Sequence, residues 1–166
     1  MIVTKQKVRH WIYVGIFLAL LGYGLYYLLL RPSGLDRSAL ETIYSEQRES
    51  YNAVGSYLSD KKYSTEITSL PTVDNSFGIK GEDTAPYRAF SDGIIRLYEK
   101  NIDKIVCKDG IVAFYLQAEG GLLNRQYAVL IYQKDTSKPL AIFDGVSAEK
   151  MTPENWYGTV CDKQSS

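Results

Sequence analysis

The side chains with the most specific chemistry in this sequence are its two cysteines, Cys107 and Cys161. They allow a single pairing, and a bridge between them would close a loop of roughly 55 residues, worth about 4 kcal/mol in the chain-entropy model. The alternative is two free thiols that pack as small apolar side chains. Structural disulfides persist in oxidising surroundings, so the choice depends on where the residues lie relative to a membrane. We predict a Cys107–Cys161 disulfide.

Groups for nucleophilic or metal-assisted catalysis are scarce. The single histidine, His10, lies close to the N-terminus, so a folded domain further along the chain lacks the imidazole of serine–histidine and cysteine–histidine systems and of histidine metal sites. The sequence has no phosphate-binding glycine loop and no paired-cysteine metal motif, and it predicts no cofactor. Acidic residues are abundant, and two-acid hydrolysis has no spacing signature. A hydrolase that works without histidine is therefore one alternative function.

The first structural element that the sequence predicts is a long apolar run near the N-terminus. Residues 11–30, WIYVGIFLALLGYGLYYLLL, contain no charge. As a helix the run would be about 30 Å long, the thickness of the hydrocarbon core of a bilayer. Aromatic side chains lie near both ends, as in membrane proteins. A buried helix of a soluble core and a secretory signal peptide are the alternatives. The run is longer than the apolar core of a typical signal peptide. It is also followed by Arg31 and Pro32 rather than by the small residues of a cleavage site. We predict an uncleaved transmembrane helix.

The charges that flank this run predict its orientation. Three basic residues and no acid precede the run, whereas basic and acidic residues alternate after it: Lys5, Lys7 and Arg9 on one side, and Arg31, Asp36, Arg37 and Glu41 on the other. Basic flanks stay cytoplasmic, so we expect a cytoplasmic tail over residues 1–10 and an extracytoplasmic domain over residues 31–166, on a single-pass protein of the cell membrane. The remaining 16 basic and 19 acidic residues give the rest of the chain a net charge of −3. Nucleic acid is therefore not an expected partner.

One face of the apolar run carries small residues. Gly15, Ala19 and Gly22 are spaced four and three residues apart, which places them on one stripe of a helix. Small residues in such a stripe let two membrane helices approach closely, so a homodimer through this face is one possible assembly. The alternative is that glycine and alanine are simply frequent in membrane helices.

Two helices are expected after the membrane segment. The first covers about residues 36–62, opens with a capping box at Ser38 and Glu41, and places apolar and tyrosine side chains on one stripe. That stripe is interpreted as a face packed on a sheet, with a partner surface as the alternative. The second helix covers Pro86 to Lys100, and Asp92-Gly93 is a possible early break.

The rest of the sequence has the period of β-strands. Asp109-Gly110 separates two apolar runs and predicts a tight hairpin. Residues 111–116 are apolar at both alternating sets of positions, which indicates a central strand covered on both faces. Further strands are expected at three places: Gln126–Lys134, Leu140–Phe143 and Trp156–Cys161. We therefore predict an α+β domain in which two helices pack on one face of an antiparallel meander of four to five strands.

A turn-rich segment from Thr68 to Ala85 separates the two helices. Long loops in compact domains often carry function, so Phe77, Glu82 and Asp83 are candidate partner contacts. The alternative is that Phe77 packs into the core of the domain. Taken together, the sequence favours a membrane-anchored binding or scaffolding module of the cell envelope that contacts the lipid bilayer and an unidentified protein partner. The alternatives are the histidine-free hydrolase and a small-ligand sensor.

Overall fold

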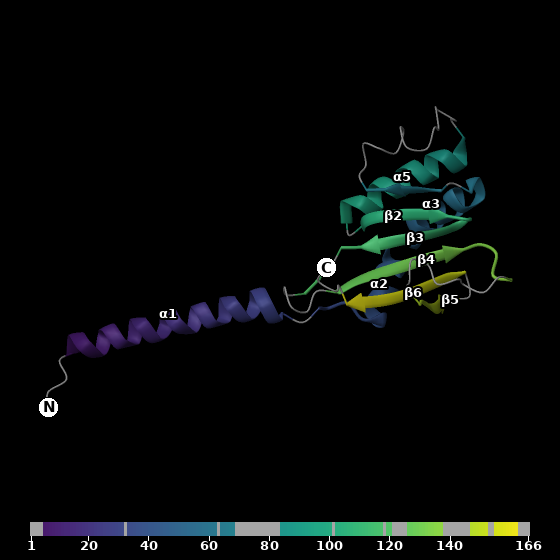
Figure 1. The fold of residues 1–166 in the computed structure, drawn as a ribbon. Coiled ribbons are helices and arrows are strands. Elements are labelled where there is room, and N and C mark those ends of the chain that lie inside the picture. The colour runs from purple at the N-terminus through teal and green to yellow at the C-terminus, as the bar shows by residue number, and fades with distance from the viewer. Residues whose placement is uncertain are drawn as a thin grey trace.

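A long N-terminal helix stands apart from an α+β domain (Figure 1). The computed structural model describes residues 5–31, 33–62, 64–68, 84–100, 102–117, 119–120, 126–137, 147–152 and 155–162. The helices are α1 (Lys5–Leu30), α2 (Arg37–Glu46), α3 (Arg48–Lys61) and α5 (Ala85–Lys100). The strands are β1 (Thr65–Ile67), β2 (Ile102–Lys108), β3 (Ile111–Leu116), β4 (Gln126–Gln133), β5 (Glu149–Thr152) and β6 (Trp156–Asp162). The predicted α+β class is confirmed.

Helix α1 has the length and composition needed to cross a membrane. Its stretch from His10 to Leu30 has a mean hydropathy of 1.9, and none of it is buried inside the protein. The helix begins at Lys5, so the basic residues before the apolar run are helical as well. After Leu30 the chain soon reaches Leu35, which is 6% exposed and belongs to the core of the domain. Five residues span at most about 18 Å, so the tether between α1 and the domain is short.

The single helix expected over residues 36–62 is two helices. Its N-cap is Asp36, whose Oδ1 accepts a hydrogen bond from the Ala39 backbone N–H at 2.7 Å, rather than the capping box at Ser38. The break falls at Gln47, whose φ of −126° and ψ of 26° are not helical. The break lets the helices pack on different strands: α2 contacts β6, while α3 contacts β3 and β4. The apolar stripe continues across the break, so the periodicity of the sequence does not indicate that the helix ends there.

Helix α5 runs unbroken from Ala85 to Lys100, so Gly93 does not end it early. This glycine lies where α5 meets α3. A Cβ atom at Gly93 would lie 3.1 Å from Val54 Cγ2 and 3.2 Å from the Ser50 carbonyl oxygen. The residue therefore serves the close approach of two helices rather than a turn.

The strands form one antiparallel sheet in the order β1-β2-β3-β4-β6-β5. The predicted hairpin joins β2 to β3, and both turn residues have the positive φ that such turns require, 53° at Asp109 and 81° at Gly110. The expected strands near Gln126–Lys134 and Trp156–Cys161 correspond to β4 and β6. Strands β1 and β5 were not predicted, and the insertion of β6 between β4 and β5 departs from a simple meander. The strand expected at Leu140–Phe143 lies outside the described residues.

Strand β3 is apolar on both faces and buried along most of its length, as expected for a central strand. Its Val112, Phe114 and Leu116 join the main core with residues of α2, α3 and α5. The alternating Ala113 and Tyr115 belong to a smaller cluster on the opposite face, with Val129 and Ile131 of β4. Helices α2, α3 and α5 therefore cover one face of the sheet, as predicted.

Candidate functional site

The hollow at the corner of the helix layer is the candidate site. The chain turns at Gln47 between α2 and α3, and the last turns of α5 form the facing wall. Together these segments enclose about 500 Å³. The lining residues come from two parts of the chain: Ser45, Glu46, Gln47, Arg48, Glu49 and Ser50 around the corner, and Arg96, Glu99 and Lys100 from α5.

The lining carries equal numbers of carboxylates and cations. Glu46, Glu49 and Glu99 supply negative charge, and all three residues are exposed. Positive charge comes from Arg48, Arg96 and Lys100, which are exposed as well. The hollow therefore presents side chains of both charge signs.

Two polar residues of the lining are less exposed than the charged ones. Ser50 is only 8% exposed. Gln47 is half-buried, and its side-chain oxygen Oε1 is fully buried and accepts no hydrogen bond from the described residues. A buried acceptor without a donor is unfavourable by about 1–3 kcal/mol. This oxygen has essentially no accessible surface, so a ligand that occupies the hollow does not reach it.

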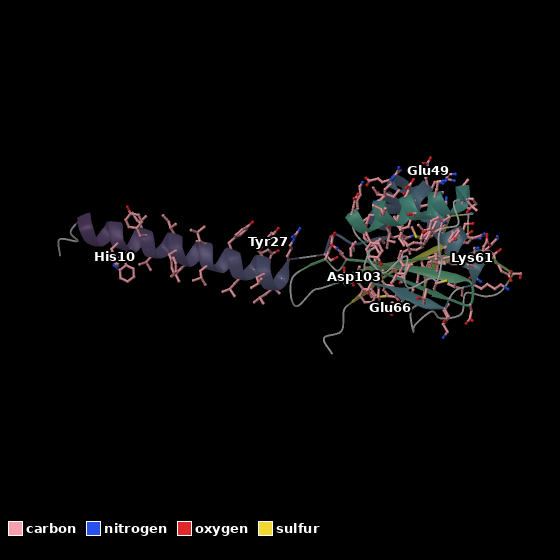
Figure 2. The ribbon with its side chains drawn as sticks, turned by 90° about the horizontal axis from the view of Figure 1, so that it is seen from above. His10, Tyr27, Glu49, Lys61, Glu66 and Asp103 are labelled. Carbon is pink, nitrogen blue, oxygen red and sulfur yellow. The ribbon has the colours of Figure 1, made fainter. Side chains whose placement is uncertain are left out.

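Figure 2 shows where Glu49, a lining residue, and Asp103 lie relative to α1. Glu49 lies on the outer side of the helix layer, away from the sheet, and Asp103 lies at the end of the domain that faces α1. Strand β2 begins at Ile102, directly after α5 ends at Lys100. The wall supplied by the last turn of α5 is therefore at the end of the domain nearest to α1.

Three ionisable groups with strongly raised pKa values lie in or against the core of the domain. Burial raises the pKa of the Tyr51 and Tyr98 hydroxyls and raises the pKa of the Cys107 thiol to about 11. The Tyr98 hydroxyl donates to the Ile67 carbonyl oxygen at 2.5 Å, which fixes α5 to the end of the edge strand β1.

The predicted Cys107–Cys161 disulfide is wrong. Both cysteines are free. Cys107 lies on β2 and Cys161 on β6, with β3 and β4 between them, so about 14 Å separates the strands, against about 7 Å for the Cα atoms of a bridge. They also face opposite sides, because Cys107 belongs to the core under the helices while Cys161 pairs with Tyr127 of the other face. Local sequence patterns do not determine strand order, and here the strand order keeps the two cysteines apart.

Near the start of the domain, side-chain contacts join the beginning of α2 to the edge strand β5. The Arg37 guanidinium forms an ion pair with the carboxylate of Glu149 and donates to the Lys150 carbonyl oxygen at 3.1 Å. It also lies 3.4 Å from the Glu41 carboxylate, one helical turn further along. The first residue of α2 is thereby tied to the strand at the far edge of the sheet.

The other residues singled out from the sequence are dispersed. Phe77, Glu82 and Asp83 lie outside the described residues. Gly15 and Gly22 lie on α1, where no atom would come within 4 Å of an added Cβ, and Ala19 lies between them on the exposed helix. Within the described parts of the chain, no group of three or more histidine, cysteine, aspartate or glutamate residues is arranged to hold a metal ion.

The hollow itself was missed by sequence reasoning. Glu46, Arg48 and Glu49 have the composition of a solvated helix surface, and no local pattern relates them to the residues of α5. No family model, curated protein or solved structure matches the chain.

Proposed function

We propose that this chain is a single-pass membrane protein whose C-terminal domain is an extracytoplasmic binding module. The observation that carries the proposal is the surface of α1. Fourteen large apolar or aromatic side chains between Trp11 and Leu30 are exposed. Leaving a single such side chain in water rather than burying it costs about 1.5–3 kcal/mol. A bilayer removes this cost along the whole helix, and the domain does not.

The ends of the apolar stretch support the same placement. Trp11 and Tyr13 lie near its start, and Tyr26 and Tyr27 lie near its end, where interfacial aromatic residues are favoured. The Arg31 guanidinium lies over the Tyr27 ring at 4.8 Å from the ring centre, which suits a cation at the level of the lipid headgroups. The basic residues before Trp11 favour a cytoplasmic N-terminus.

The domain supports a binding role because its charged hollow has the size of a ligand site. A membrane-bound sensor of a small ligand is the second candidate, and it depends on the same hollow. A scaffolding role would instead use the outer surface of the domain to hold an envelope protein. Both roles require the domain to be exported and to remain attached to the membrane.

Two measurements on the host cell test this proposal. A reporter enzyme that is active only outside the membrane, fused after Ser166, is expected to be active, and a reporter active only in the cytoplasm is expected to be inactive. The fusion is also expected to stay in the membrane fraction after alkaline extraction. Replacement of Lys5, Lys7 and Arg9 by Glu is the matched variant and is expected to lower the external signal. A soluble product, or activity of the cytoplasmic reporter alone, contradicts the proposal.

A further inference from the structure

We propose that Arg31, supported by the tyrosine rings at the end of α1, binds the phosphate of an anionic phospholipid in the leaflet next to the domain. This inference deepens the proposed function and rests on it, because it gives the end of the membrane helix a specific lipid partner. Arg31 directly follows Leu30, the last residue of α1 and of the apolar span. Its guanidinium therefore lies where the acyl region meets the headgroups.

The Arg31 side chain belongs to a ladder of three side chains spaced four residues apart. The ring centres of Tyr23 and Tyr27 are 6.2 Å apart, and the Arg31 guanidinium lies 4.8 Å from the centre of the Tyr27 ring. Figure 2 shows Tyr27 near the end of α1 that faces the domain. All three residues are exposed, so a lipid in contact with this side of α1 reaches the whole ladder.

The ring beneath Arg31 leaves its hydrogen-bond donors available. Packing against an aromatic ring uses the face of a guanidinium, and the N–H groups remain at its edges. Two of these N–H groups can donate to two oxygens of one phosphate. The Tyr27 ring therefore holds the cation in place without taking up the donors that a phosphate needs.

No carboxylate neutralises Arg31 in the described part of the chain. The next acid in the sequence, Asp36, caps α2 by accepting from the Ala39 backbone N–H. The Glu119 carboxylate lies near the tether, since its Oε2 would be 3.4 Å from a Cβ at Gly34, but it forms no ion pair with Arg31. The positive charge at the end of α1 is therefore available to a lipid anion.

A lipid with a net negative headgroup is the best match for this single cation. The ammonium group of a zwitterionic headgroup cancels the phosphate charge, whereas phosphatidylglycerol carries no cation. The acyl chains of a phospholipid also hold its phosphate at the depth of Arg31, which raises its effective concentration above that of a free phosphate ion. The carbonyl groups at the C-terminus of α1 carry partial negative charge, so we expect a moderate preference rather than tight binding.

Lipid retention by the full-length chain in micelles of a nonionic detergent tests the proposal. The micelles contain equimolar phosphatidylglycerol and phosphatidylcholine, and native mass spectrometry counts the lipids that stay on the chain. Lys5, Lys7 and Arg9 attract anionic lipids too, so every chain carries glutamine at these three positions. We expect a preference of about fivefold for phosphatidylglycerol, as for one basic residue near an anionic surface.

The Arg31→Gln variant is expected to lower this preference to less than about twofold, because it removes the cation. Arg37→Gln is the matched control: Arg37 is also an exposed arginine, but it is paired with Glu149, and its loss is expected to leave the preference unchanged. Equal retention of the two lipids by the chain that keeps Arg31, or a preference that Arg31→Gln leaves intact, overturns the proposal.

Variants of the rings test the ladder. Tyr27→Leu is expected to reduce the preference at least about twofold, whereas Tyr27→Phe keeps a ring face for the cation and is expected to preserve it. Tyr26→Leu is the matched control, because Tyr26 lies at nearly the same depth but about 100° away around the helix. Equal losses in Tyr26→Leu and Tyr27→Leu would contradict a specific role of the ring under Arg31.

Solid-state NMR tests the contact with phosphate itself. In bilayers of phosphatidylglycerol, a chain with ¹⁵N-labelled arginine and the same three glutamines is expected to show a dipolar contact between a guanidinium nitrogen and lipid ³¹P that Arg31→Gln abolishes. A contact that persists in Arg31→Gln, or no contact in either chain, overturns the proposal. The reporter fusions keep the two proposals separate: a cytoplasmic C-terminus with this contact present overturns only the topology, and external topology without the contact overturns only the lipid site.

Discussion

The side chain of Asn52 is expected to control the stability of the domain out of proportion to its size. Its Oδ1 accepts a hydrogen bond of 2.8 Å from the Trp156 indole N–H and lies 3.4 Å from the Tyr44 hydroxyl. Trp156 is fully buried and contacts the rings of Tyr44, Tyr51, Phe114 and Tyr132. This one amide therefore satisfies the only polar atom of the largest side chain in the core.

Asn52→Ala removes the acceptor and leaves the indole N–H buried. A buried donor without a partner costs about 1–3 kcal/mol, and the longer contact to Tyr44 adds little. We expect a loss of about 2 kcal/mol in the free energy of unfolding, which raises the unfolded fraction about 30-fold. Urea unfolding of the full-length chain in a mild detergent, followed by far-UV circular dichroism, measures this loss. Ser56→Ala on the same helix is the control and is expected to change stability by less than about 0.5 kcal/mol.

A double-mutant cycle identifies the cause of the loss. Trp156→Phe removes the donor, so Asn52→Ala is expected to cost at least about 1 kcal/mol less in that background. The reasoning is refuted if Asn52→Ala costs the same with and without the indole N–H. A loss below about 0.5 kcal/mol in the wild-type background would also refute it, since the indole would then have found another acceptor.

Three further outcomes follow from the packing. Gly55→Ala is expected to destabilise by about 1–3 kcal/mol in urea unfolding despite the better helix propensity of alanine, because the new Cβ would lie 2.9 Å from Tyr132 Cγ; unchanged or higher stability would contradict this. Burial raises the pKa of Cys107 from 9.0 to about 11. The thiol of the unfolded chain therefore loses its proton at lower pH, and the free energy of unfolding is expected to fall between about pH 9 and pH 11. Cys107→Ala is expected to show a smaller fall over this range, and an equal fall would contradict the prediction. Arg37→Met is expected to speed amide hydrogen exchange in β5, which Arg37 ties to α2, while Lys108→Met is not; equal rates would show that the tie is dispensable.

Features that depend on neighbouring residues were predictable from the sequence. The Asp109-Gly110 turn was identified because few residue pairs adopt positive φ at both positions. The central position of β3 followed from apolar residues at both alternating sets of positions. Helix α5 followed from its apolar periodicity, although Gly93 looked like a break until its packing against Val54 was known.

Features that depend on tertiary contacts were not predictable. Strand β1 is three residues long, too short to show a period, and its place at the edge is fixed by pairing with β2 and by the hydroxyl of Tyr98. The failure of the disulfide follows from strand order, which local patterns do not encode. The hollow combines residues near Gln47 with residues near Glu99, and each set alone has the composition of a solvated helix surface.

Labelling with a membrane-impermeant maleimide in intact host cells tests the central claim most directly. The chain carries Ala89→Cys on the exposed side of α5, in a Cys161→Ser background, and Cys107 is 2% exposed and does not compete. Lys5→Cys in the same background is the matched variant for the other side of the membrane. The proposal predicts that the residue introduced at position 89 is labelled before the cells are permeabilised, on a full-length band in the membrane fraction, and that the residue at position 5 is labelled only afterwards. Labelling of position 89 only after permeabilisation, or on a shorter soluble band, would contradict a membrane-anchored domain that faces outward.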